Sequence, residues 1–433
     1  MGFFFLILLT ATIFIRPAEL FDALRGLEIY LYLIVPCLLL SFQAVLVQLS
    51  SRNMQSQPIM YFVLMFLLGV FLSELAHFDI DGILTDGWAF TKNIIYYVLL
   101  ISLVNTPERL KQLLFWIWFF SLCYIILILL QYNGLITLHI ATEAMSDSYV
   151  SATGEKLLVS RMTGSGIFTD PNDICTVIIT GFVLSLYGIA GHFFWLPRVL
   201  FVASSLVYCY ALQQTQSRSG FMGLAVAGGT LLLARYGWKT GAKLLVVAIP
   251  LVLPLLGGRL TNISTQEGTA QTRFGLWRDG LQYFKGSPIF GIGISKYQLF
   301  TESHHAAHNA YVTALVETGL FGSTFFNGAF FLTLWTMYRL GNARTEIADQ
   351  NLQQMQPFMM ALTAGISFLL ISLSQTYYIS TYMILGLLTA YMQLSKASNI
   401  FRDIRVGSTL MKRIGLANLS FALVMYIFTR IFI

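Results

Sequence analysis

Long apolar segments recur along almost the whole chain, and they constrain the fold more than any other feature of the sequence. A stretch of about 17 to 25 apolar residues is long enough to cross a bilayer as a helix. We expect about twelve such spans, at residues 3–15, 29–49, 58–74, 89–105, 112–131, 172–190, 193–212, 219–234, 242–256, 309–338, 357–376 and 378–394. The sequence therefore predicts an all-α polytopic membrane protein.

The composition excludes an ordinary soluble domain. Of the 433 residues, 56% are hydrophobic and 11% are charged, whereas soluble domains carry roughly 25% charged residues. The first apolar segment is as short as that of a signal peptide, but no basic start and no small-residue cleavage site precede Arg16 and Pro17. We count it as a span and treat residues 1–433 as a single membrane domain.

The charges predict the topology, because short loops rich in Lys and Arg stay cytoplasmic. Cations fall in the predicted inner loops and in the tail if the N-terminus is inside: Arg52, Arg109, Lys111, Arg198, Arg235, Lys239, Lys243, Arg339, Arg344, Lys396, Arg402, Arg405, Lys412 and Arg413. The predicted outer segment 74–87 instead holds four acids, Glu74, Asp79, Asp81 and Asp86, and no Lys or Arg. We expect both ends of the chain in the cytoplasm.

Two longer segments, 132–170 and 257–307, fall on the predicted outer side. The second carries five cations against the charge bias, Arg259, Arg273, Arg278, Lys285 and Lys296. These cations need a reason other than topology. The tail, 395–433, ends in an apolar but short stretch that includes Arg430, so we expect an interfacial helix there rather than a thirteenth span.

The four cysteines, Cys37, Cys123, Cys175 and Cys209, all lie in predicted spans. Buried apolar packing is the interpretation that we favour. A bridge between Cys175 and Cys209 stays open, because both positions fall in the outer half of the membrane.

The segment RMTGSGIFTDPND begins at Arg161 and leads into a predicted span. Asp170 followed by Pro171 is typical of a helix start, where Asp accepts first-turn N–H groups and Pro has no donor to lose. This explanation does not include Arg161. Arg161 is therefore either part of an anion-binding site or an anchor at the membrane interface, and the sequence leaves both roles open.

The segment TQSRSG places Arg218 at the outer end of a predicted span. An arginine there could snorkel to the headgroups. Against that interpretation, Ser217, Ser219 and Gly220 leave space around the guanidinium and supply donors near a helix N-terminus, which attracts phosphate.

The segment TRFGLWRDGLQYFKGSPIFGIGISKY has apolar residues at helical spacing, at Phe274, Trp277, Leu281 and Phe284, with Arg273 beside them. We expect a helix on the membrane surface. The GIG that follows is not a nucleotide fingerprint, because no strand precedes it. We expect no cofactor and no nucleic-acid partner.

Three histidines, His304, His305 and His308, stand before an apolar helix in HHAAHNAYVTALVETGLFG. We favour His308 as a general base, with Asn309 in a supporting role, because imidazole is the side chain that ordinarily exchanges a proton near neutral pH. Metal ligation by the histidines and a purely structural His308 are the alternatives. Glu317 is not its partner, since nine helical residues put it on the opposite face and about 13 Å deeper.

In this order, SRSG, TRFGLW, PIFGIG and HNAYVTALVETGLFG resemble the O-antigen ligase and Wzy-type polymerase superfamily, over about residues 160–325. Its members are bacterial inner-membrane glycosyltransferases that move a glycan from undecaprenyl diphosphate to a second saccharide on the periplasmic face. The resemblance implies that Arg218 and Arg273 contact the diphosphate and that His308 is the base. Arg161 looks like the basic residue before the PN-containing helix start.

The residue chemistry agrees with this resemblance. A lipid diphosphate is a good leaving group, so it needs fixed positive charge rather than an acid, and arginines supply that charge. We expect an inverting, metal-independent transfer to lipid A core or to a growing glycan. Only 34 residues separate Arg273 from His308, which favours polymerisation. The alternative is a flippase or other transporter, whose charges should lie near the midplane rather than at one face.

Overall fold

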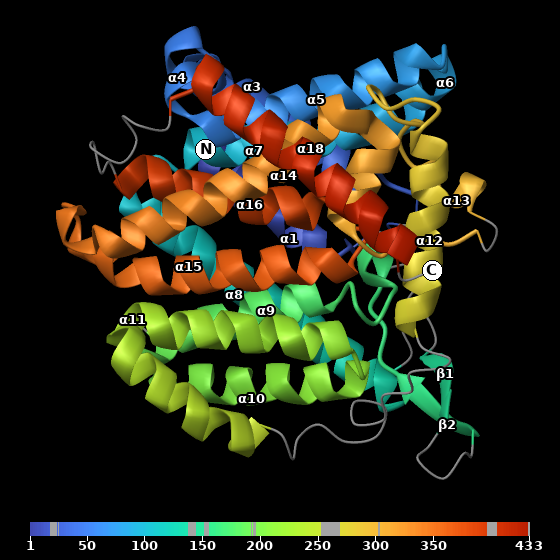
Figure 1. Ribbon diagram of the computed structural model, residues 1–433. Helices are drawn as coiled ribbons and strands as arrows, with labels where there is room; N and C mark the ends of the chain where they lie inside the picture. The colour runs from blue at the N-terminus through green and yellow to red at the C-terminus, as the bar shows by residue number, and fades with distance from the viewer. Residues whose placement is uncertain are drawn as a thin grey trace. The chain divides into compact units, whose positions relative to one another are not determined.

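The computed structural model describes residues 1–433 apart from 18–23, 25, 137–143, 151–155, 192, 194–195, 253–268, 302–303, 396–404 and 432–433. Within the described residues, regular structure is helical except for one two-stranded sheet (Figure 1). The chain divides into two compact units. The first contains Met1–Ser41, Leu103–Thr265 and Asp349–Leu369, and the second contains Phe42–Ser102, Gln266–Ala348 and Leu370–Ile433.

The first unit is a helical bundle with a hairpin. Its elements are α1 (Gly2–Phe14), the first part of α3 (Ile29–Gln48), α8 (Pro107–Tyr132), β1 (Met145–Val150), β2 (Lys156–Arg161), η3 (Gly166–Phe168), α9 (Cys175–Ile189), α10 (Arg198–Thr215), α11 (Arg218–Val252) and α15 (Gln350–Leu369). The predicted span 219–234 and the described part of the predicted span 242–256 are two arms of α11, which reverses at Gly237 with φ 76° and ψ 167°.

Buried polar contacts hold this bundle together. The indole N–H of Trp118 lies 3.1 Å from Ser185 Oγ and 3.2 Å from Ser204 Oγ, which joins α8 to α9 and α10. A Cβ at Gly181 would lie 2.1 Å from the Tyr208 ring, so only glycine lets α9 and α10 approach this closely. Small residues and hydrogen bonds between helices are typical of membrane bundles.

The hairpin was not predicted. Strands β1 and β2 pair antiparallel, with Met145 opposite Arg161 and Val150 opposite Lys156. It occupies part of the expected outer segment 132–170, so the fold is nearly all-α rather than all-α. The four cysteines of the chain are free thiols, and the bridge left open between Cys175 and Cys209 does not form.

The second unit contains the rest of the helices. They are α4 (Ser51–Ser56), α5 (Pro58–Ala76), α6 (Ile80–Gly82), η2 (Ile83–Gly87), α7 (Trp88–Leu103), α12 (Thr269–Phe284), α13 (Tyr297–Phe300), α14 (Ala310–Asn342), η6 (Arg344–Glu346), η7 (Leu370–Ser372), α16 (Ile379–Ser395) and α18 (Ser408–Ile431). Helix α5 packs closely on α14, because a Cβ at Gly69 would lie 2.8 Å from the Cα of Gly322.

A helix overlaps each predicted span, but the count of about twelve is not confirmed. Among the described residues, five segments are long and apolar enough to cross a membrane by length and composition: Ile29–Gln48, Pro58–Ala76, Pro107–Tyr132, Gln350–Ser372 and Ser408–Ile431. The last of these was expected as an interfacial helix. Helix α18 has 24 residues because its helical conformation starts before the apolar stretch of the tail.

Candidate functional site

In the first unit, Arg161 and the TQSRSG segment meet at one amide side chain. The Arg161 guanidinium donates to the Thr215 carbonyl at 3.0 Å and to Asn172 Oδ1 at 3.3 Å. The Ser217 hydroxyl donates to the same Asn172 oxygen at 2.6 Å. Arg161 is only 5% exposed and Ser217 only 1%. These bonds form one buried polar cluster, which connects the last residue of β2 with the segments that precede α9 and α11.

Asp170 orients this amide. Its Oδ1 accepts the Asn172 backbone N–H at 2.6 Å and the Asn172 side-chain N–H at 2.7 Å. The bond to the backbone N–H is the helix-start role that the sequence predicted, made one turn before α9 begins at Cys175. The Asn172 amide therefore has its oxygen turned toward Arg161 and Ser217.

Arg218 is the first residue of α11, and its neighbours have structural roles. Ser217 accepts the Gly220 backbone N–H at 3.1 Å, which makes it the cap of the helix. Ser219 Oγ lies 3.1 Å from Ser217 Oγ. A Cβ at Gly220 would lie 2.5 Å from Cys175 Sγ, so Gly220 permits close packing of α11 on α9. Arg218 itself is half-buried.

In the second unit, Arg273 lies in the first turns of α12, the helix predicted from the apolar spacing. The Phe274 ring centroid is 5.0 Å from that of Phe428, and Leu281 is 3% exposed. The apolar face of α12 therefore packs against α18 and α14 within the protein. One turn after Arg273, the Trp277 indole N–H donates to the Ala307 carbonyl at 2.7 Å.

His308 follows Ala307 directly and has a constrained backbone. Its φ of 47° is left-handed, and its N–H donates to Ser374 Oγ at 2.9 Å. A positive φ outside glycine is uncommon and often marks functional positions. His308 is half-buried, whereas His304 and His305 are exposed. Across the described ranges, no group of three or more His, Cys, Asp or Glu side chains is arranged to hold a metal ion.

Asn309 caps α14. Its side-chain oxygen accepts the N–H groups of Tyr311 at 3.1 Å and Val312 at 3.2 Å, and the residue is 4% exposed. The Thr376 hydroxyl donates to the Ala310 carbonyl at 2.9 Å. Asn309 thus fixes the point at which α14 begins, directly after His308.

The PIFGIG motif fills a break in α14. At Gly319, φ is 65° and ψ is −168°, so the helical hydrogen bonds are interrupted. The freed carbonyls of Val316 and Glu317 accept N–H groups from Ile292 and Gly293 at 3.0 Å each. On the other side of the break, Leu320 and Phe321 donate to the carbonyls of Pro288 and Ile289 at 2.8 and 3.0 Å. Broken helices are tolerated at membrane depth where other protein groups satisfy the backbone in this way.

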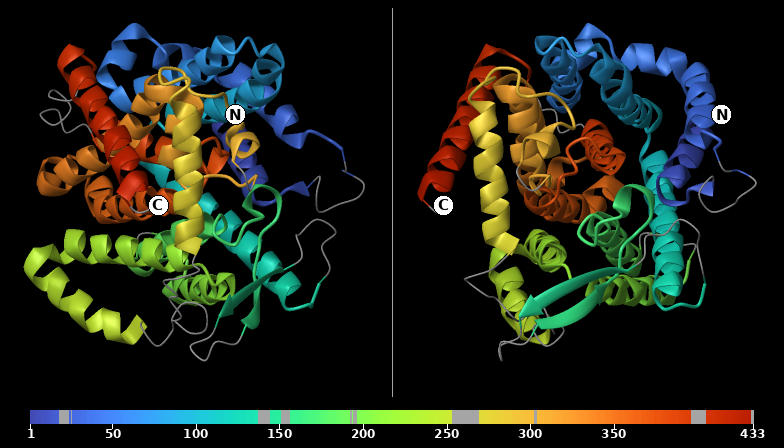
Figure 2. Two further views of the ribbon diagram at one scale, coloured as in Figure 1. Left: turned by 45° about the vertical axis from the view of Figure 1, so that its right-hand side comes forward. Right: turned by 90° about the vertical axis from the view of Figure 1, so that its right-hand side faces the viewer.

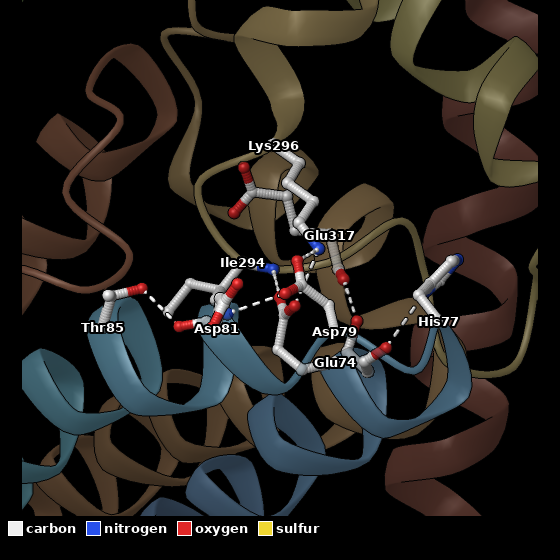
Figure 3. A network of polar contacts seen from close by, with 10 residues as sticks. Glu74, His77, Asp79, Asp81, Thr85, Ile294, Lys296 and Glu317 are labelled. Atoms are coloured by element: carbon white, nitrogen blue, oxygen red, sulfur yellow. Dashed lines mark hydrogen bonds and ion pairs between the residues drawn. The ribbon is translucent and has the colours of Figure 1, made fainter.

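A buried ion pair holds the same segment to α5 (Figure 3). Glu74 is 0% exposed; its Oε1 accepts the Ile294 N–H at 2.6 Å and its Oε2 accepts Lys296 Nζ at 2.7 Å. Lys296 also contacts Asp79 Oδ2 at 2.6 Å. The hydrogen bond from Lys296 lowers the pKa of Asp79. Burial disfavours the charged Lys296, but its bonds to Asp79 and Glu74 outweigh that effect and raise its pKa.

Glu317 belongs to the same arrangement. Its Oε1 accepts the Tyr297 N–H at 3.0 Å, and its carbonyl accepts the Ser73 hydroxyl at 2.6 Å. The Tyr297 N–H is thus the buried partner that the carboxyl group of an intramembrane acid needs. Glu74 and Glu317 together hold the backbone from Ile294 to Tyr297. The sequence alone did not connect either glutamate with this stretch. The one available indication was the opposite charge of segments 74–87 and 257–307.

The proposed site residues therefore form two clusters, one in each unit. Arg161, Ser217 and Ser219 are joined through Asn172 in the first, where Arg218 begins α11. In the second, the helix of Arg273 is joined to the His308 segment through Trp277. The cations that opposed the topology have other contacts: Lys296 pairs with Glu74, Arg278 with Asp279, and Lys285 lies 4.9 Å from the Tyr426 ring, whereas Arg259 lies outside the described residues.

The comparison with known families identifies part of the chain. Residues 199–326 match the family described as O-Antigen ligase. No curated protein matches the chain significantly. The matched range contains Arg218, Arg273 and His308, and Arg161 precedes it. The match confirms the resemblance to the O-antigen ligase and Wzy-type superfamily, and together with the apolar helices it indicates a membrane protein of polysaccharide biosynthesis.

Proposed function

We propose that the chain belongs to the O-antigen ligase and Wzy-type superfamily and is a glycosyltransferase that moves a glycan from undecaprenyl diphosphate to a saccharide acceptor. We place the reaction at the periplasmic face of a bacterial inner membrane. The main support is that one matched stretch, 199–326, contains an arginine at a helix start, Arg218, and a constrained, half-buried histidine, His308.

The donor diphosphate is the group that the arginines would bind. Arg218 is at the N-terminus of α11, where backbone N–H groups and the helix dipole favour an anion. Arg273 and Arg161 are the further donor-binding residues of the proposal. Guanidinium groups match phosphate oxygens in a planar, two-pronged geometry and stabilise the charge that develops as the diphosphate leaves.

His308 is the proposed general base. The acceptor hydroxyl gives its proton to the imidazole while its oxygen bonds to the anomeric carbon of the donor sugar. The bond from that carbon to the diphosphate breaks, and its electron pair leaves on the diphosphate oxygen. This single displacement inverts the anomeric configuration and calls for no metal or cofactor. The bonds of Ser374 and Asn309 would hold the histidine segment in place for it.

Purified protein supplied with a lipid-linked glycan tests the proposal. We expect glycan transfer, and for a polymerase a ladder of lengthened chains without lipid A core. A single transfer that requires lipid A core would identify a ligase instead. Movement of the intact lipid-linked glycan across vesicles without any transfer would contradict an enzyme and favour a flippase. Activity that a chelator removes and a divalent ion restores would contradict the metal-independent mechanism.

The histidine assignment has a matched control in the same segment. We expect His308→Ala to abolish transfer while protein abundance and donor binding stay near wild type. His305→Ala should keep wild-type activity, because His305 is exposed. Near-normal transfer by His308→Ala would overturn the general-base role.

The arginines are tested by charge-conserving changes. Arg218→Ala and Arg273→Ala should weaken donor use. Lys at either position should rescue poorly, since an ammonium has no planar fork. Unchanged donor dependence with Lys at both positions would contradict two-pronged phosphate recognition.

A further inference from the structure

Helix α18 extends from the neighbourhood of α4 to that of α12 (Figures 1 and 2). Just before its start, the Val406 N–H donates to the carbonyl of Gln55, in α4, at 3.3 Å. Near its other end, the Phe428 ring centroid lies 5.0 Å from that of Phe274 and 6.3 Å from that of Trp277. Its 24 residues span about 36 Å, more than the roughly 30 Å of hydrocarbon in a bilayer.

The middle of α18 is bonded to α14 by polar side chains. Asn418 is 3% exposed, and its amide N–H groups lie 2.8 Å from Ser323 Oγ and 3.1 Å from Thr324 Oγ1. Asn327 donates to the Asn418 oxygen at 2.8 Å. Hydrogen bonds of this kind stabilise helix pairs inside membranes.

The two helices are antiparallel. At the start of α18, Ile414 packs on Gly328, and the next turns bring Asn418 to Ser323. Further along, Ala422 packs in one cluster with Leu315. As the number rises along α18 it falls along α14, so the end of α18 lies at the end of α14 where His308 and its cap are found.

Helix α18 carries two cations near its start and one, Arg430, in its last turn. Its first turns carry Lys412 and Arg413, both exposed, on the side where α4 carries Arg52. At the other end, Tyr426 has Arg430 at 5.7 Å and Lys285 at 4.9 Å from its ring centroid. An excess of cations marks the cytoplasmic end of a span, and a Tyr with a snorkelling Arg is typical of an interface.

We propose that α18 crosses the bilayer, that its end at Ile431 lies on the same side as His308, and that Phe428 is a positioning residue for α12 and hence for Arg273. This replaces the expectation of an interfacial tail helix that stays in the cytoplasm. The proposed topology does not depend on the proposed function. The positioning role of Phe428 does rest on the proposed function.

Cysteine labelling tests the topology. The four native cysteines are replaced by Ser, and single cysteines are introduced by Ile431→Cys, by His304→Cys and by Arg405→Cys; all three positions are exposed. Intact cells made permeable only in the outer membrane are treated with a membrane-impermeant maleimide. We expect Ile431→Cys to label like His304→Cys, and Arg405→Cys to label only after lysis. If Ile431→Cys and Arg405→Cys showed the same labelling, either both before lysis or both only after it, the two ends of α18 would lie on one side and the crossing would be overturned.

Donor kinetics test the positioning role. Phe428→Ala should raise the donor KM about two- to tenfold, the equivalent of one aromatic contact, while the acceptor KM and Tm stay near wild type. Phe428→Tyr should restore the donor KM, because the ring is kept. Leu423→Ala is the control, since Leu423 is 58% exposed on the same helix. An unchanged donor KM in Phe428→Ala would overturn the positioning role.

The two tests separate this proposal from the proposed function. Wild-type protein that transfers no glycan would contradict the function, but the labelling pattern would still report the side on which α18 ends. Wild-type transfer combined with a cytoplasmic Ile431 would contradict the crossing alone.

Discussion

The indole N–H of Trp277 and the carbonyl oxygen of Ala307 lie 2.7 Å apart, so the helix that carries Arg273 is bonded to the residue before His308. Ala307 is 0% exposed, and its carbonyl is therefore shielded from water. A buried carbonyl without a partner costs about 1–3 kcal/mol. The tryptophan of the TRFGLW motif thus links that motif to the HNAYVTALVETGLFG motif.

Replacing Trp277 with Phe keeps an aromatic ring and removes only the donor. We expect kcat to fall, by up to about 100-fold for a displacement near 1 Å, with a small decrease in Tm. Trp335→Phe is the matched control, because Trp335 is 46% exposed on α14. Initial rates at saturating donor and acceptor measure the effect. Equal kcat in the two variants would mean that the bond does not position the histidine segment.

A methyl group at Gly319 should be severely destabilising. The residue has a positive φ, in a region that costs other residues about 1–3 kcal/mol. An added Cβ would also lie 2.3 Å from the Ile289 carbonyl oxygen. We expect Gly319→Ala to lose folded protein by size-exclusion chromatography in detergent. Gly275→Ala, which has nothing within 4 Å, should be tolerated; similar yields of the two would contradict this account.

Helix positions were predictable from the sequence, because the backbone of a long apolar segment in lipid must satisfy its own hydrogen bonds and a helix does so within one segment. The predicted span 29–49 and the observed Ile29–Gln48 differ by one residue. The hairpin of β1 and β2 was missed, since it lies between the apolar segments and no long alternating pattern marks it. The extent of α18 was also missed, because its first turns include Lys412 and Arg413 and reduce the apolar length.

The candidate site was predictable only as separate motifs. Arg161 and Thr215 are 54 positions apart, and Glu74 and Lys296 are 222 apart. Contacts at such separations depend on helix packing, and no local pattern specifies them. Helical geometry predicted that Glu317 lies on the opposite helix face from His308 and about 13 Å deeper, but its bond to Tyr297 required the structure.

Changing Asn172 should alter donor use through Arg161. Asn172→Ala removes the oxygen shared by Arg161 and Ser217 and should raise the donor KM modestly. Asn172→Asp places a carboxylate beside the guanidinium and neutralises its attraction for a diphosphate, so the donor KM should rise further, by about tenfold or more. Rates at varied donor concentration measure both. A donor KM in Asn172→Asp equal to that of wild type would contradict an anion-binding role for Arg161.

Removing Lys296 should leave Glu74 buried without its cation. Loss of one partner of a buried pair costs about 3–5 kcal/mol, so Lys296→Met should lower Tm clearly. The double variant Glu74→Gln with Lys296→Met should recover part of that loss, because a neutral amide still accepts the Ile294 N–H. Asp81→Asn, an exposed acid in the same segment, is the control. A double variant less stable than Lys296→Met would contradict this explanation.

The contact between Lys296 and Asp79 should make the free energy of unfolding depend on pH. The pKa of Asp79 is lowered by its hydrogen bond from Lys296, so its contribution is present above the unfolded pKa of about 3.9 and is lost as the pH falls through the lower folded value. The raised pKa of Lys296 gives a contribution that is present below about 10.4 and is lost as the pH rises through the higher folded value.

We therefore expect the Tm difference between wild type and Asp79→Asn to be constant from about pH 5 to 9 and to shrink below about pH 4. Thermal unfolding in detergent across this range measures it, and Asp81→Asn should show no such change. A difference that persists undiminished at pH 2 would mean that the Asp79 carboxylate does not stabilise the segment through Lys296.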